Sequence, residues 1–194
     1  LALSTDLTIE KDFNSICNNL PLDIFVNRIH NENPLTKENL LKMYKKIKPI
    51  TEKILPGEKI NTVAYGCTSG TIAIGEDKVK AEVQLAKPQC YVTTPITSAI
   101  KAFKLMNIKK IAVFTPYPES VNKTIYDYFS KKNIEVLSFG TFNLELDSDF
   151  ANIDPEYLSE TLIKLNTSGA DALFISCTAL PALEIINKVE QKIN

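Results

Sequence analysis

The sequence predicts an α/β protein built from two similar halves, each a parallel sheet covered by helices on both faces. Apolar segments typical of strands alternate with segments of helical periodicity along the 194 residues, a pattern typical of such sheets. The order strand–helix–strand–helix–strand occurs twice, and each copy ends in an apolar strand followed by Cys-Thr. We therefore predict an N-terminal half, residues 1–90, that carries Cys67, and a C-terminal half, residues 91–194, that carries Cys177.

The first half is expected to contain three strands separated by helices. Ile9, Phe13 and Ile16 recur at helical spacing and predict one buried helix face. Thr36 is a suitable cap for a long helix that Pro56-Gly57 ends. The expected elements are a strand at residues 1–4, a helix to about residue 19, a strand at 22–28, a helix from 36 to about 54, a strand at 61–65 and a less regular helical segment at 70–85.

The second half repeats this order. Pro155 follows Asp154 at an expected helix start, where proline is favoured in the first position. Residues 142–152 mix polar and apolar side chains without a period and predict a long loop. The remaining expected elements are a short extended piece at 90–93, a helix from 95, a strand at 110–115, a helix at 119–132, a strand at 134–139, the strand before Cys177 and a final helix from about residue 180.

Composition excludes several classes of function. The chain has 22 Lys and Arg against 23 Asp and Glu, so no basic surplus indicates nucleic acid or a membrane surface as a partner. No apolar run approaches the roughly 20 residues of a membrane span. Four cysteines without a CxxC pair, and His30 as the single histidine, argue against a zinc site and for a reduced, cytoplasmic protein without a metal or cofactor. Both termini are expected to be trimmed.

Two of the cysteines occupy positions where a thiol is activated. Cys67 and Cys177 each follow an apolar strand and precede an expected helix, and the positive end of a helix dipole favours thiolate. A single cysteine at such a place is usually a small buried residue, but two matching Cys-Thr pairs favour a shared site. Because ligands bind beyond the carboxyl ends of parallel strands, we expect the thiols to face each other across one cleft. Cys17 and Cys90 lack this setting.

At this point the motifs resemble those of a known group of enzymes. Gly66-Cys67-Thr68-Ser69-Gly70-Thr71 and Ser176-Cys177-Thr178-Ala179-Leu180-Pro181 are similar to the paired cysteine motifs of the aspartate/glutamate racemase superfamily. The branch it most resembles contains maleate cis–trans isomerases, arylmalonate decarboxylases and ectoine-utilisation racemase-like proteins. Leu3-Ser4-Thr5-Asp6 and Thr115-Pro116-Tyr117 extend the resemblance. It implies two pseudo-symmetric Rossmann-like (flavodoxin-like) halves with the active site in the cleft between them.

The resemblance also implies roles for individual residues. Cys67 and Cys177 would be the catalytic pair, and Thr68 and Ser69 would bind a substrate carboxylate that the amide of Thr178 helps to hold. The decarboxylases of this branch have glycine in place of the first cysteine. Because this chain keeps both thiols, we expect isomerisation rather than decarboxylation.

Two further positions bear on the substrate. The resemblance places Tyr117 over the site as a carboxylate ligand. Maleate isomerases carry asparagine where this chain has Asp6, and an aspartate suits a substrate ammonium rather than a second carboxylate. As an alternative, Asp6 would cap a helix.

We therefore expect a cofactor-independent racemase or isomerase of a small amino-acid-like or dicarboxylic acid, with the two thiols as opposed acid and base. A maleate-type cis–trans isomerase with Cys67 as nucleophile, an arylmalonate-type decarboxylase that uses Cys177 alone and a non-enzymatic small-acid binding protein remain alternatives. Homo-oligomerisation is possible. Neither nucleic acid nor a membrane is expected as a partner.

Overall fold

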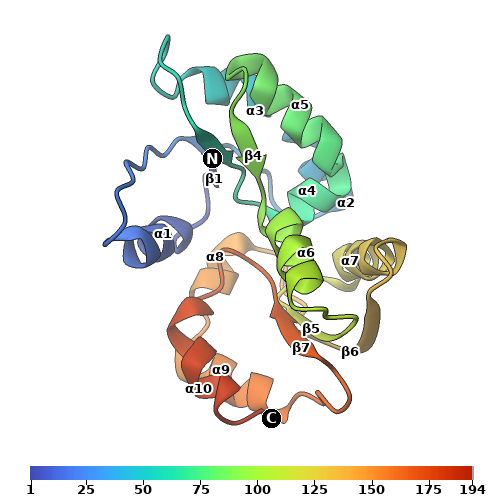
Figure 1. Ribbon diagram of the computed structural model, residues 1–194. Helices are drawn as coiled ribbons and strands as arrows, with labels where there is room; N and C mark the ends of the chain where they lie inside the picture. The colour runs from blue at the N-terminus through green and yellow to red at the C-terminus, as the bar shows by residue number, and fades with distance from the viewer. Residues whose placement is uncertain (194) are drawn as a thin grey trace.

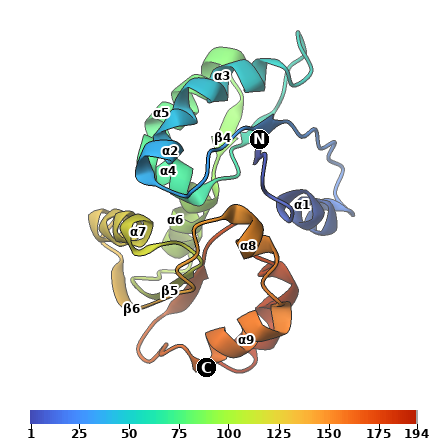
Figure 2. The ribbon, with the colours of Figure 1, turned by 180° about the vertical axis from the view of Figure 1, so that it is seen from behind.

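Two groups of parallel strands, each with its own helices, make up the protein. The computed structural model describes residues 1–193, and Figures 1 and 2 show one group around β1 and β4 and the other around β5 and β7. All paired strands are parallel. The predicted α/β class is therefore confirmed.

The N-terminal strands are short. They are β1 (Ala2–Leu3), β2 (Arg28–Ile29), β3 (Thr62–Ala64) and β4 (Tyr91–Thr93), paired as β1 with β2 and β3 with β4. Two further hydrogen bonds place β1 beside β3: the Leu1 amine donates to the Ala64 carbonyl over 2.7 Å, and the Gly66 amide donates to the Leu1 carbonyl over 2.9 Å. The strand order is thus β2-β1-β3-β4.

The C-terminal strands repeat that order. They are β5 (Lys110–Thr115), β6 (Glu135–Thr141) and β7 (Ala172–Ile175), arranged as β6-β5-β7. In both groups the first strand lies between the second and the third, which is the architecture expected of a duplicated fold. Since side chains of both groups share one apolar core that includes Ile29, Tyr65, Ile96 and Val113, the two groups pack directly against each other.

Helices connect and cover the strands. They are α1 (Ile9–Cys17), α2 (Lys37–Lys42), α3 (Tyr44–Glu52), α4 (Thr68–Ile74), α5 (Glu76–Ala86), α6 (Pro95–Leu105), α7 (Glu119–Lys131), α8 (Asp147–Ala151), α9 (Pro155–Lys164), the 3₁₀ turn Leu183–Ile185 and α10 (Ile186–Glu190). α6 starts at a capping box in which Thr94 and Thr97 bond reciprocally. No helix of residues 1–193 is long and apolar enough to cross a membrane.

Several expected elements are wrong in detail. The predicted strand at 22–28 is largely irregular, because only Arg28 of that run pairs with a neighbouring strand. The predicted long helix from Thr36 is interrupted at Met43, whose amide donates to Leu40 three residues back, the tighter spacing of a 3₁₀ turn. On α1, Ile9 is buried as expected, but Phe13 and Ile16 are exposed.

Two corrections lie in the second half. The predicted loop at 142–152 contains α8, whose first turn carries Asp147 and Asp149, and acidic side chains favour a helix N-terminus. The helix expected from about residue 180 begins only at Leu183. Pro181 lacks an amide hydrogen and therefore prevents a regular helix from starting directly after Cys177.

Candidate active site

The two Cys-Thr motifs meet at the carboxyl ends of β3 and β7. The Thr178 hydroxyl lies 3.2 Å from the Gly66 carbonyl and 2.9 Å from Asp6 Oδ2, and can donate to either. Residues adjacent to the two cysteines are thus in direct contact, although they are more than 100 positions apart in the chain.

Cys67 caps the helix that follows it. The Gly70 amide donates to Cys67 Sγ over 3.2 Å, and the Ser69 hydroxyl lies 3.7 Å from the sulfur. A serine or asparagine oxygen normally accepts the bond from this third helical residue, and here sulfur takes that place. Cys67 is 4% exposed. The local design therefore directs two donors at a buried thiol.

Cys177 has a different setting. The Ala179 amide lies 3.4 Å from Cys177 Sγ, and no regular helix follows until Leu183. Tyr117 is buried beside this thiol, with its hydroxyl 3.1 Å from Ser176 Oγ. The position of Tyr117 in the site was expected from the sequence, whereas its contact with Ser176 was not.

Desolvation favours the protonated form of both thiols in the substrate-free protein. Desolvation raises the pKa of Cys67 to about 12, while the Gly70 amide and the Ser69 hydroxyl act in the opposite direction. Desolvation also raises the pKa of Cys177, opposed by Tyr117 and the Ala179 amide. Since burial disfavours charge, a thiolate forms here only when a further group compensates for it.

The first turn of α4 offers free donors. Thr68 and Ser69 are both buried, and their amides have no hydrogen-bond acceptor among the described residues. Such amides are the groups that hold a carboxylate at a helix start. Thr178 likewise has an unpaired amide within residues 1–193.

Asp6 is buried, and its carboxylate is fully engaged by the protein. Oδ1 accepts from the Thr8 amide and the Ile9 amide, both over 2.9 Å, and from the Thr8 hydroxyl over 3.1 Å. Oδ2 accepts from Thr178. Asp6 therefore caps α1 and ties the first turn of the chain to the second cysteine motif.

Asp147 is a site residue that sequence reasoning missed. It begins α8, which lies where the two groups of strands approach each other (Figures 1 and 2). Its Oδ2 accepts from Thr5 Oγ1 over 2.7 Å and from Asn31 Nδ2 over 2.6 Å. Its charge acts on both thiols, raising the pKa of Cys67 and of Cys177. Asp147 thus belongs to the same site as the cysteines.

The site contains two carboxylates that no cationic side chain among the described residues neutralises. Neither Asp6 nor Asp147 forms an ion pair with Lys or Arg within residues 1–193. Arg28 approaches, but it donates to the Asp6 carbonyl and pairs with Glu10. No cluster of three or more metal-ligating side chains occurs in the described part of the chain.

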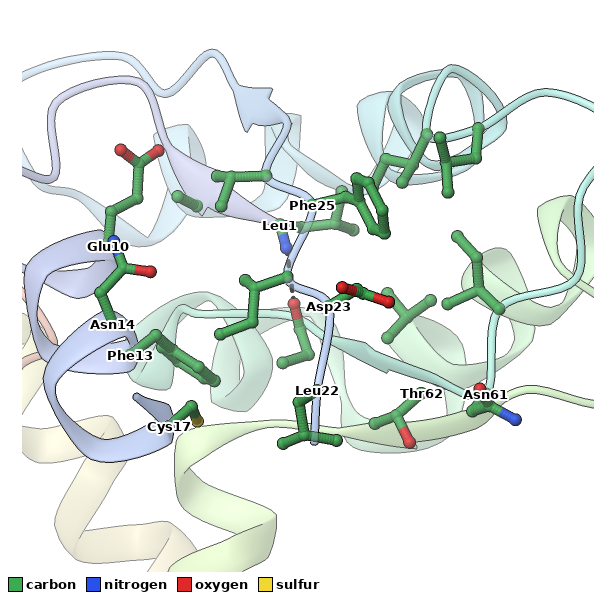
Figure 3. A pocket seen from close by; sticks show the side chains of 18 of the residues that line it. Leu1, Glu10, Phe13, Asn14, Cys17, Leu22, Asp23, Phe25, Asn61 and Thr62 are labelled. Atoms are coloured by element: carbon green, nitrogen blue, oxygen red, sulfur yellow. Dashed lines mark hydrogen bonds between the residues drawn. The ribbon is translucent and has the colours of Figure 1, made fainter. Parts of the chain in front are cut away.

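A separate groove lies away from the thiols. It has a volume of about 560 Å³ and is lined by α1, the irregular segment after it and the end of β3. Figure 3 shows Phe13, Cys17, Leu22 and Phe25 around it. None of the predicted site residues lines this groove. Cys17 therefore lies on this groove, and His30 lies exposed on the surface.

Comparison with known proteins identifies relatives of the same fold. A family model described as arylmalonate decarboxylase matches residues 76–194. The maleate isomerase of Alcaligenes faecalis is 26% identical over 147 residues, which are 72% of this chain and 58% of that protein. The chain thus spans less than two thirds of the length of this relative.

Solved structures agree over almost the whole chain. The maleate isomerase Iso from Pseudomonas putida S16 superimposes with a TM-score of 0.87 at 20% identity, covering 98% of this chain and 82% of that one. A cysteine-to-serine variant of the Nocardia farcinica maleate cis–trans isomerase gives 0.86 at 16% identity, covering 98% and 81%. These likenesses establish the fold with two Rossmann-like halves.

Proposed function

The chain belongs to the arylmalonate decarboxylase family, and from this premise we propose that it is a cofactor-independent isomerase of a small carboxylate. Cys67 is the nucleophile and Cys177 the acid. The observation that carries the proposal is the meeting of the two cysteine motifs through the Thr178–Gly66 contact, with Cys67 buried and Cys177 half-buried. A single-thiol reaction gives no reason for the second cysteine and its donors.

The unequal settings of the thiols support this assignment of roles. Cys67 faces an amide and a hydroxyl at a helix start, where negative charge on sulfur is favoured. Cys177 lacks a following helix, and desolvation raises its pKa, a setting that suits the protonated form. The neighbouring Nocardia farcinica enzyme, in the variant described above, contains a covalently bound succinylcysteine intermediate, which supports a cysteine nucleophile for this fold.

The reaction needs no co-reactant. As the substrate binds, Cys67 gives its proton to water. The resulting thiolate adds to a carbon–carbon double bond next to the substrate carboxylate, and Cys177 gives its proton to the neighbouring carbon. The former double bond is now single and rotates. Cys177 then takes a proton back, the carbon–sulfur bond breaks and the trans product leaves. Cys177 is protonated again, and the Cys67 thiolate recovers its proton from water. The free amides of Thr68 and Ser69 hold the carboxylate during these steps.

Racemisation, which the sequence led us to place first, is the second candidate. Each thiol has its own amide donor, so each can carry charge in turn while the other gives a proton to the opposite face of the α-carbon. Decarboxylation through Cys177 alone is the third reaction of this family that the residues permit, and it leaves Cys67 without a role.

Three measurements separate these reactions. A covalent adduct on Cys67 during turnover supports cis–trans isomerisation. Solvent deuterium at the α-carbon of recovered substrate, without an adduct, supports racemisation. Full carbon dioxide release by Cys67→Ala would show that the two-thiol mechanism is wrong. Tight binding of a small acid that is unchanged by Cys67→Ser and Cys177→Ser, without turnover, would instead indicate a binding protein.

A further inference from the structure

Asp147 has one carboxylate oxygen that the protein leaves free. Oδ2 accepts from Thr5 and Asn31, whereas Oδ1 has no hydrogen-bond partner among residues 1–193. No fully enclosed side-chain oxygen or nitrogen in the described chain lacks a partner, so Oδ1 must retain accessible surface. The residue as a whole is only 3% exposed. Its free oxygen is therefore accessible although the residue is almost fully buried.

This arrangement differs from that of Asp6. Both oxygens of Asp6 accept hydrogen bonds from neighbouring amides and hydroxyls, which leaves little capacity for a ligand. The sequence suggested Asp6 as the partner of a substrate ammonium. Asp147 is better placed for that role, because one of its oxygens is free. The bonds from Thr5 and Asn31 fix the Asp147 side chain and leave one oxygen to receive a donor.

A second substrate carboxylate does not fit beside Asp147. Like charges at close range are strongly unfavourable in a buried site. Arg28, the single arginine of the sequence, is directed at Glu10 and at the backbone carbonyls of Leu3 and Asp6. Within residues 1–193 no Lys or Arg forms an ion pair with Asp147 that would offset two neighbouring carboxylates.

We infer that Asp147 selects a substrate that carries one ammonium group together with one carboxylate. The ammonium donates to Asp147 Oδ1, and the carboxylate lies against the free amides of Thr68 and Ser69. This inference rests on the proposed function, because it assigns the two ends of the substrate of that same site.

The electrostatics of the thiols agree with this assignment. Desolvation is the main cause of the raised pKa of Cys67 and of Cys177, and the negative charge of Asp147 acts in the same direction. An ammonium bound to Asp147 offsets that charge and makes a thiolate less costly. Binding of the correct substrate therefore helps to activate the nucleophile, whereas a dicarboxylate opposes its activation.

Binding of two matched saturated acids tests the inference without turnover. Succinate carries two carboxylates, and in 4-aminobutanoate an aminomethyl group replaces one of them. Calorimetric titration of the full chain is expected to show at least about tenfold tighter binding of 4-aminobutanoate. In Asp147→Asn this preference is expected to fall by about tenfold or more, because a charge-assisted hydrogen bond is lost.

Two further variants separate selectivity from stability. Asp149→Asn changes an exposed carboxylate on the same short helix and is expected to leave the preference unchanged. Asp147→Glu keeps the charge and is expected to retain part of the preference. It therefore separates the effect of removing the charge from an effect of misfolding. The inference is overturned if succinate binds the wild type as tightly, if Asp147→Asn leaves the ratio unchanged, or if neither acid binds.

Turnover of the unsaturated counterparts distinguishes this inference from the proposed function. Maleate and cis-4-aminobut-2-enoate differ, like the saturated pair, by the replacement of one carboxylate with an aminomethyl group. If the preference for 4-aminobutanoate is found but neither unsaturated acid is isomerised or labelled, the inference stands and the proposed function fails. If maleate is isomerised and the amino acid is not, the proposed function stands and the inference fails.

Discussion

Replacing Gly70 by alanine tests whether the position of the Cys67 sulfur is decisive. An alanine methyl built on this backbone would lie 2.8 Å from Cys67 Sγ, from Met43 Cε and from the Tyr65 hydroxyl oxygen. Ordinary contact begins at 3.4 Å, so each pair must separate by about 0.6 Å. Since Tyr65 and Met43 are tightly buried, the sulfur is expected to take up much of this shift.

The expected effect on stability is small and the expected effect on activity is large. Overpacking costs about 1–3 kcal/mol, whereas replacing a helical glycine by alanine stabilises by about 0.5–1 kcal/mol. The net loss in the free energy of unfolding is therefore about 0–2.5 kcal/mol. A misplacement of about 1 Å in a reacting group can lower a rate about 100-fold. We therefore expect Gly70→Ala to lower turnover by about 10- to 100-fold.

Proton NMR of cis–trans conversion measures the activity, and urea unfolding measures the stability. Gly140→Ala is the matched control, because its methyl would lie 2.7 Å from Phe114 Cδ2 and 3.1 Å from Leu165 Cδ1, in a core region outside the site. It is expected to cost similar stability while folded protein keeps activity within about twofold. Gly70→Ala with wild-type turnover would refute the idea that Cys67 is held in a reactive position.

Three other results are expected. Cys67 binds its proton more tightly in the folded state, where its pKa is about 12, than at the ordinary value of 9.0; stability is therefore fully present below pH 9 and falls as pH rises toward 12, by up to about 1.4 kcal/mol per pH unit for this thiol. Urea unfolding from pH 8 to 11 should show a shallower fall in Cys67→Ser, and equal slopes would contradict the assignment. Asp6→Ala removes the acceptor of two α1 amides and should cost about 2–3 kcal/mol in the free energy of unfolding; an unchanged unfolding midpoint would speak against a capping role. Tyr117→Phe removes the hydroxyl beside Ser176 and should lower turnover about 10-fold or more, and undiminished turnover would exclude Tyr117 from the reaction.

The sequence was informative where local signals coincide. Both cysteines follow apolar runs and precede small residues, so the end of each strand and the start of the next segment could be located without long-range information. The repeated strand order then placed both motifs at corresponding edges, and Thr178 indeed contacts Gly66.

Asp147 could not be found in this way. Its surroundings lack helical periodicity, and its partners Thr5 and Asn31 are 142 and 116 positions away. Burial of a carboxylate that depends on such distant contacts leaves no local signal. For the same reason the apolar segment at 22–28 suggested a strand, because its composition does not reveal whether a neighbouring strand is available to pair with it.

The most direct test of the proposed mechanism is mass spectrometry of Cys177→Ser incubated with cis-4-aminobut-2-enoate or maleate. In this variant the carbanion takes its proton from water, and no Cys177 thiolate is present to remove that proton and expel Cys67. The peptide that contains Cys67 should therefore gain the mass of one substrate molecule. The same peptide should stay unmodified in Cys67→Ser. An unmodified Cys67 in Cys177→Ser, under conditions in which the wild-type enzyme isomerises the same acid, would contradict nucleophilic catalysis by this thiol.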